Sequence, residues 1–191
     1  MEENLSSDYS SKISIKTKNI SEDQKLLSIS NIIAELLKDI CESGKSNSDS
    51  NVLLIKPFIS KKIPGITIKD YMDRLLKYSK AFNGIFIIIL IYLDTICTKH
   101  TINLNYNNIH KFILAAFIAA IKFHEDEYYS ISYYAKLGGI TQKEAINLEY
   151  EFLSLIDFKL FINQELYDKY YDNLSNLSNA EEEEDSDNDF D

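Results

Sequence analysis

The chain has 191 residues, of which 45% are hydrophobic and 12% aromatic, which is enough for one domain with a full core. Two prolines and five glycines leave few chain breaks, so the composition favours long helices over a turn-rich β fold. Of its net charge of -10, eight acids lie in residues 181–191, and the rest carries 22 acids against 20 bases. A near-neutral body gives no support for binding to nucleic acid or to an anionic membrane.

Three features bear on the cellular compartment. Residues 1–20 are polar and serine-rich, so they do not have the pattern of a secretory signal. Cys41 and Cys97 are far apart and lack CxxC spacing, so they predict neither a zinc site nor a disulfide framework. The apolar run from Ile85 to Leu93 has about half the length of a membrane span and is followed by Asp94. We therefore expect an intracellular protein, in the cytoplasm, the nucleus or both.

The first part of the chain divides into three predicted segments. Residues 1–20 are predicted to be flexible. Apolar residues then recur at helical spacing, which predicts an amphipathic helix over 21–42 with Ser21 as its cap. Residues 43–56 begin with SGKSNSDSN, a composition typical of a linker.

Residues 57–172 are predicted to form an all-α domain, because they show helical patterns, short connections and no strand alternation. By periodicity, the segment up to Lys99 fits a strand or a buried helix, and its length favours a helix. Residues 173–191 lack the apolar content to fold alone and are predicted to be a disordered acidic tail. The expected helices begin near Thr67, after Asn83-Gly84, at Asn108, at Ser132, after Thr141 and at Asn163.

The segment from Ile109 to Phe123 is apolar on nearly every side, which predicts a helix surrounded by other helices. It contains Lys122, whose ammonium must reach a surface, find an acid or serve a partner, because an unpaired buried charge is costly. Glu149 lies on the apolar side of a later helix, and Arg74 and Asp94 are a second set of opposite charges. Such charges predict structural ion pairs or a polar site for a partner.

Other patterns could suggest catalysis. Gly44-Lys45-Ser46 could suggest a phosphate loop, but Asp39 stands where such a loop requires its first glycine. His124 to Glu127 could suggest a metal site, but consecutive helical residues point in different directions. The three histidines have no Ser or Cys partner at a recognisable spacing. We therefore expect no enzyme activity, metal or cofactor.

Five segments carry a family pattern by their order and spacing. They are Ile68 to Tyr78 (IKDYMDRLLKY), Ile91 to Asp94 (IYLD), Asn108 to Phe123 (NIHK through AIKF), Tyr134 to Ile140 (YAKLGGI) and Leu148 to Leu153 (LEYEFL). Together, over roughly residues 57–172, they resemble a cyclin, and most of all the single-box P/U-type cyclins related to the yeast phosphate-pathway cyclin.

The resemblance implies a five-helix cyclin box with an additional N-terminal helix and a C-terminal flanking helix. It implies a non-enzymatic subunit that forms a heterodimer with a cyclin-dependent kinase and activates it. By the same resemblance, Arg74 and Asp94 form a structural ion pair, whereas Lys122 and Glu149 face the kinase. The sequence departs from the pattern at Lys111, where many P/U-type cyclins have Arg.

The implied mechanism is conformational. A kinase needs its αC Glu paired with its β3 Lys, and a cyclin docked on αC holds that arrangement. Lys122 would bond to backbone carbonyls near αC, while Phe123 and Phe152 would exclude water.

A cyclin box also occurs in non-kinase scaffolds of transcription, so protein scaffolding stays open as an alternative function. In the tail, Ser186 is followed by Asp187 and Asp189, which makes it a candidate site for an acidophilic kinase.

Overall fold

The computed structural model describes the backbone of residues 5–43 and 52–187 and the side chains of residues 22–43 and 53–178. Within these ranges every regular element is a helix, which confirms the predicted all-α class. The elements are α1 (Leu5–Ser43), α2 (Val52–Ile55), the short 3-10 helix η2 (Lys56–Phe58), α3 (Ile68–Lys77), α4 (Ile85–His100), α5 (Ile109–His124), α6 (Ile131–Leu137), α7 (Gln142–Leu155) and α8 (Gln164–Asp187).

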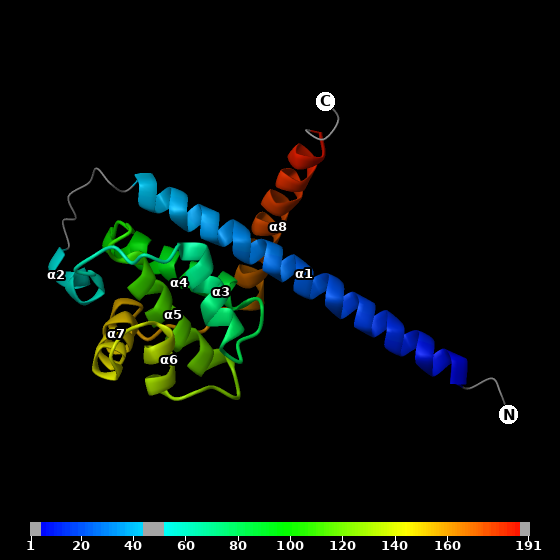
Figure 1. Cartoon of the computed structure of the whole chain (residues 1–191), viewed down its shortest axis with the longest axis horizontal. Coiled ribbons are helices and arrows are strands. Elements are labelled where there is room, and N and C mark those ends of the chain that lie inside the picture. Colours follow the sequence, from blue (N-terminus) through cyan, green and yellow to red (C-terminus); the bar gives the residue numbers. More distant parts are fainter. Residues whose placement is uncertain (1–4, 44–51, 188–191) are drawn as a thin grey trace.

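Helix α5 lies at the centre of the bundle, with α4 and α7 packed along it and α3 on another side (Figure 1). Every side chain from Phe112 to Ile121 is buried. Alanines at four of these positions let neighbouring helices approach closely, while Phe112 and Phe117 fill the space between them. Each large apolar side chain removed from water here contributes about 1.5–3 kcal/mol. The prediction of a helix surrounded by helices is confirmed.

Helix α4 confirms that the apolar segment after Gly84 is a helix. Nine of its side chains are buried, and the helix ends where Thr101 takes the left-handed conformation, with φ 50°. None of the helices within the described residues combines the length and the apolar character that a membrane crossing requires.

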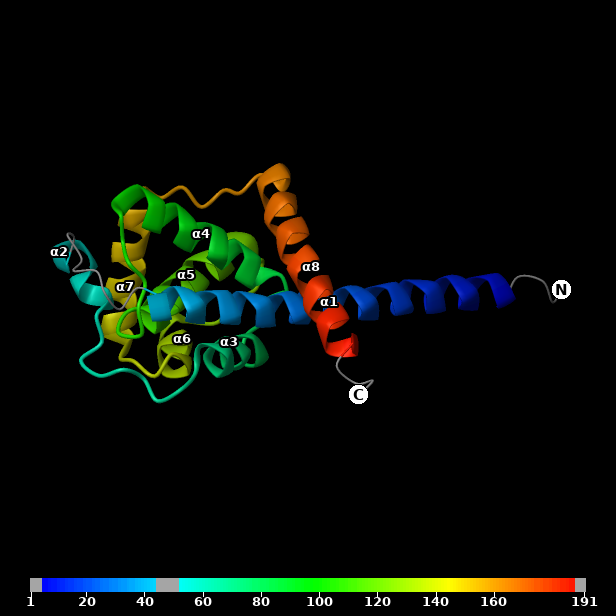
Figure 2. The ribbon, with the colours of Figure 1, turned by 90° about the horizontal axis from the view of Figure 1, so that it is seen from above.

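Helices α1 and α8 flank the bundle and cross each other, as the two perpendicular views show (Figures 1 and 2). The second half of α1 packs on α3 and α4 through buried residues between Ile29 and Cys41. Where α8 crosses α1, the hydroxyls of Ser28 and Ser178 lie 2.6 Å apart. The small serines allow the two helices to come close together.

The two ends of the chain were predicted to be irregular. The backbone of α1 is helical from Leu5, and that of α8 is helical to Asp187, although the side chains before Glu22 and after Ser178 lie outside the described ones. The proposed division into a flexible start, a linker over 43–56 and a disordered tail stays a prediction. Residues 44–51 of that linker, with Gly44-Lys45-Ser46, lie outside the described residues.

Threonine side chains cap two helices, at positions where a threonine is followed three residues later by an acid: Thr67 with Asp70 and Thr141 with Glu144. Thr67 Oγ1 accepts a hydrogen bond of 3.0 Å from Asp70 N at the start of α3, and Thr141 Oγ1 accepts one of 3.2 Å from Glu144 N at the start of α7. These bonds satisfy backbone N–H groups that have no partner inside the helix.

Removal of the α3 cap is expected to lower the free energy of unfolding. Thr67→Ala should cost about 1 kcal/mol, because the N–H of Asp70 loses its acceptor. Thr98, exposed inside α4, provides the control: Thr98→Ala should not lower the free energy of unfolding, because alanine has the higher helix propensity. Urea denaturation followed by circular dichroism measures both, and equal effects would contradict the capping role.

Candidate partner-binding site

Lys122 and Glu149 meet at the edge of the core. Lys122 Nζ lies 2.7 Å from Glu149 Oε1 and 2.8 Å from Oε2, so one ammonium contacts both carboxylate oxygens. The side chains are 31% and 16% exposed, respectively. Lys122 and Glu149, the two charges that the sequence places on apolar helices, therefore form one ion pair that remains accessible to a partner.

Helical spacing explains why these charges reach the edge. The buried side of α7 is formed by Ala145, Leu148, Phe152 and Leu155, and Glu149 lies directly beside this stripe. Lys122 follows Ile121, the last fully buried residue of α5, and lies in the last turn of the helix. A positive charge is favourable there, because the carbonyl ends of the helix carry partial negative charge.

Three exposed apolar side chains lie on the same two helices as the ion pair, within three residues of it along the sequence. Phe123 is 50% exposed, Ile146 is 51% exposed and Tyr150 is 62% exposed. Ile146 and Tyr150 are four residues apart on α7, so they share one side of the helix with Glu149. We call Lys122, Phe123, Ile146, Glu149 and Tyr150 the α5–α7 patch. Exposed apolar residues gathered around a polar pair are typical of a protein interaction surface.

The sequence analysis selected neither Ile146 nor Tyr150 as a partner contact. The structure shows that Ile146 faces away from the core. Their four-residue spacing, offset from the stripe of Ala145 and Leu148, is the signal that could have separated them.

Phe152, expected beside the kinase, is fully buried. Its ring packs against Tyr92 of α4, with ring centroids 6.2 Å apart. Because it lies in the buried stripe of α7, Phe152 packs α7 against the core and has no exposed surface for a partner. Only Phe123 of the two predicted apolar contacts is exposed.

A hydrogen-bonded chain holds the end of α5 that carries the patch. Tyr92 Oη donates to the carbonyl of Leu160 over 2.6 Å, and His124 Nε2 lies 3.0 Å from the same hydroxyl. Since the tyrosine proton goes to Leu160, the histidine N–H donates to Tyr92. Burial lowers the pKa of His124, which keeps the ring neutral at pH 7.

The acids after His124 stabilise a neighbouring connection. Glu125 Oε1 accepts a 2.8 Å hydrogen bond from the backbone N–H of Phe82, and Glu127 pairs with Lys80. These contacts hold the α5–α6 connection against the chain between α3 and α4. Among the described residues, no three His, Cys, Asp or Glu side chains converge as metal ligands would.

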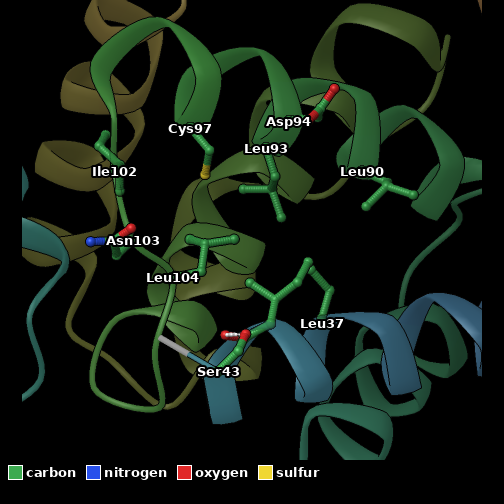
Figure 3. Close-up of a pocket in the computed structure, with 10 residues that line it drawn as sticks. Leu37, Ser43, Leu90, Leu93, Asp94, Cys97, Ile102, Asn103 and Leu104 are labelled. Carbon is green, nitrogen blue, oxygen red and sulfur yellow. Dashed lines mark hydrogen bonds between the residues drawn. The ribbon is translucent and has the colours of Figure 1, made fainter. Parts of the chain in front are cut away.

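The structure does not bring Arg74 and Asp94 together in an ion pair. The Asp94 carboxylate accepts a 2.6 Å hydrogen bond from Tyr170 Oη of α8. This bond adds to burial in raising the pKa of Tyr170 to about 12. Asp94 lies at the edge of an apolar hollow of about 340 Å³ between α1 and α4 (Figure 3). Arg74 is on α3 and lines a different hollow, to which α6 also contributes. The two charges therefore lie in different crevices of the bundle.

Lys111, where the family pattern often has Arg, has a structural role. Its ammonium lies 2.8 Å from Glu144 Oε1 and also donates to the carbonyls of Pro57 and Ile59, over 3.4 and 3.3 Å. Acceptors in several directions suit the three N–H groups of an ammonium better than the planar fork of an arginine. Lys111 thus links the chain around η2 to α5 and α7.

Comparison with known proteins identifies the family. The family model described as Cyclin matches residues 10–160. This chain belongs to the cyclin family. The PHO85 cyclin-like protein psl1 of Schizosaccharomyces pombe is 37% identical over 162 residues, which are 79% of this chain and 67% of that protein.

Two further relatives extend the match to other cyclins. PHO85 cyclin-7 of Saccharomyces cerevisiae is 31% identical over 167 residues, 78% of this chain and 59% of that protein. Cyclin-U2-1 of Arabidopsis thaliana is 33% identical over 114 residues, 59% of this chain and 51% of that protein. These names confirm the resemblance to P/U-type cyclins. The matched part of the chain spans from about half to two thirds of the length of these relatives.

Truncation of Phe152 and of Phe123 should distinguish a core residue from a residue exposed to a partner. Phe152→Ala is expected to lower the free energy of unfolding by about 3–5 kcal/mol, because it opens a cavity in the core. Phe123→Ala should lower it by less than about 1 kcal/mol, because that ring is half exposed. Chemical denaturation of both variants provides the comparison, and similar losses would show that Phe123 is also a core residue.

Removal of Arg74 should leave the fold intact. The side chain of Arg74 is exposed and forms no ion pair or hydrogen bond with another described residue, so Arg74→Ala is expected to change the free energy of unfolding by about 0.5 kcal/mol or less. Thermal and urea melts measure this effect. A loss of about 3–5 kcal/mol would instead indicate the buried ion pair that the sequence suggested.

Proposed function

We propose that this chain is the regulatory subunit of a cyclin-dependent protein kinase and binds the kinase through the α5–α7 patch. The observation that carries the proposal is the partly exposed Lys122–Glu149 ion pair among exposed apolar side chains, in a member of the cyclin family. Two relatives carry names that refer to PHO85 cyclins, which supports a kinase as the partner.

The ion pair keeps hydrogen-bonding capacity for a partner. An ammonium has three N–H donors, and Glu149 engages Lys122 through one side of that group. A remaining donor can reach a backbone carbonyl of the kinase, while the carboxylate can accept from a kinase N–H. Such bonds become stronger once a partner excludes water from the site.

The apolar members of the patch supply most of the binding free energy in this proposal. Phe123, Ile146 and Tyr150 would pass from water into the interface, and aromatic side chains at the centre of an interface are frequent hot spots. The packing of Phe152 and the Tyr92–His124 hydrogen bond hold α7 and the end of α5 against α4. The patch therefore needs little reorganisation on binding.

The mechanism is conformational. In an active kinase the αC Glu is paired with the β3 Lys, which positions the nucleotide phosphates and the metal ions. Docking of α5 and α7 against αC would favour that arrangement, and the chemical step would belong to the kinase. Since linkage is reciprocal, a kinase already held in the active conformation should bind this chain more tightly.

Disruption of the ion pair should weaken kinase binding. Lys122→Ala and Glu149→Ala are each expected to reduce affinity for the kinase that co-purifies from the native cell by roughly ten- to a hundredfold, with a parallel loss of activation. Both variants should still unfold cooperatively. Lys38→Ala, which removes an exposed ion pair with Glu35 on α1, is the matched control and should bind normally.

Exchanging the charges of Lys122 and Glu149 distinguishes a contact with the partner from a purely structural ion pair. The double variant Lys122→Glu with Glu149→Lys keeps two opposite charges at the same edge but reverses the groups offered to the kinase. It should unfold like the wild-type chain and fail to bind. Restored binding in the double variant would show a purely structural pair, and a co-purifying transcription complex without a kinase would contradict the proposed function.

A further inference from the structure

The segment that carries α2 and η2 has an exposed surface that is both apolar and basic. Leu53 is 87% exposed, and Leu54 and Ile63 are exposed as well. Exposed lysines lie between and beside these apolar side chains in the sequence. We call this area the α2–η2 surface; its members are Leu53, Leu54, Lys56, Lys61, Lys62 and Ile63.

Core contacts decide which side chains of this segment face outward. Ile55 and Phe58 are buried, and the ring of Phe58 stacks on that of Phe112 with ring centroids 4.1 Å apart. The backbone N–H of Ser60 donates a 2.7 Å hydrogen bond to the carbonyl of Asn107. These contacts hold the segment against the start of α5, so the exposed side chains need little ordering when a partner binds.

The positive charge of the α2–η2 surface is not compensated within the segment. Residues 52–69 contain four lysines and no acid. Lys69 pairs with an acid of α3, whereas the ammonium groups of Lys56, Lys61 and Lys62 form no ion pair or hydrogen bond within the described part of the chain. Exposed apolar side chains among unpaired cations suit an acidic partner that also carries an apolar residue.

The chain itself contains a segment with the complementary chemistry. Residues 181–191, EEEEDSDNDFD, have eight acids, no base and one aromatic residue, Phe190; we call them the acidic segment. Opposite charges grouped in this way attract each other, and the attraction is strongest at low ionic strength. An anionic membrane is a less suitable partner for the lysines, because it would repel a chain whose net charge is -10.

The arrangement of the helices favours a contact between two copies of the chain. The two perpendicular views place α2 and the C-terminal end of α8 on opposite sides of the bundle (Figures 1 and 2). The backbone of α8 is helical to Asp187 and runs away from α2. If the acidic segment of each copy contacts the α2–η2 surface of the other, the assembly closes as a two-fold dimer.

We propose that the α2–η2 surface binds the acidic segment of a second copy of this chain. The lysine ammonium groups donate to the carboxylates, and Phe190 packs beside Leu53 and Leu54. The α2–η2 surface shares no residue with the α5–α7 patch, so the contact leaves that patch open to a partner. The inference therefore stands or falls independently of the proposed kinase binding.

Sedimentation velocity of the full chain without a kinase tests the contact. We expect about twice the single-chain mass of 22.1 kDa at low salt, and the single-chain mass at high salt, where exposed charges are screened. Lys61→Gln combined with Lys62→Gln should raise the dissociation constant at least about tenfold, and Leu53→Ser should also raise it. Lys77→Gln combined with Lys143→Gln removes two exposed lysines elsewhere and is the matched control, which should dimerise like the wild-type chain.

A mixture of two variants tests which surfaces pair. The Lys61→Gln, Lys62→Gln variant keeps its acidic segment, and a variant with glutamine at each position from Glu181 to Glu184 keeps its α2–η2 surface. Each variant alone should stay a monomer. The mixture should form a complex with one copy of each, because the acidic segment of the first can bind the surface of the second.

Several results would overturn the inference. They are a single-chain mass for the wild-type chain at low salt, an equal loss of association in the control pair, and a mixture of the two variants that does not associate. Binding of a monomeric wild-type chain to vesicles that contain phosphatidylserine would identify a membrane, and not a second copy, as the partner. Thermal melts check that each variant is folded, since the substituted lysines and Leu53 are exposed.

Discussion

The complete burial of α5 is the constraint on which the rest of the structure depends. Because side chains from Phe112 to Ile121 meet other helices on every side, charged groups can occur only at the two ends of the helix. At each end a lysine finds an acid on α7: Lys111 pairs with Glu144, and Lys122 pairs with Glu149. The most completely buried helix of the domain is thereby linked at both ends to α7.

These two ion pairs have the same chemistry and different surroundings. The ammonium of Lys111 also bonds to two backbone carbonyls of the chain around η2, so its donors are used within the fold. The ammonium of Lys122 bonds only to Glu149 among the described residues, and the two helices that carry this pair also carry exposed apolar side chains. The residues around each ion pair, more than the pair itself, distinguish a structural contact from a binding site. This contrast is why the proposed kinase contact centres on Lys122.

The α5–α7 patch combines one partly exposed ion pair with exposed apolar side chains, which suits a stable protein partner.

Local sequence patterns were enough to predict the all-α class, a central apolar helix surrounded by others, helix starts at Thr67 and Thr141, and Lys122 and Glu149 as the charges to explain. These follow from local rules of periodicity, capping and the cost of burying charge. The packing of the folded chain was needed to show that Phe152 is buried while Phe123 and Ile146 are exposed, and that Arg74 and Asp94 do not form an ion pair. A helical stripe gives the apolar side of a helix, but its edges, and the charges that meet across them, depend on how segments distant in sequence pack together.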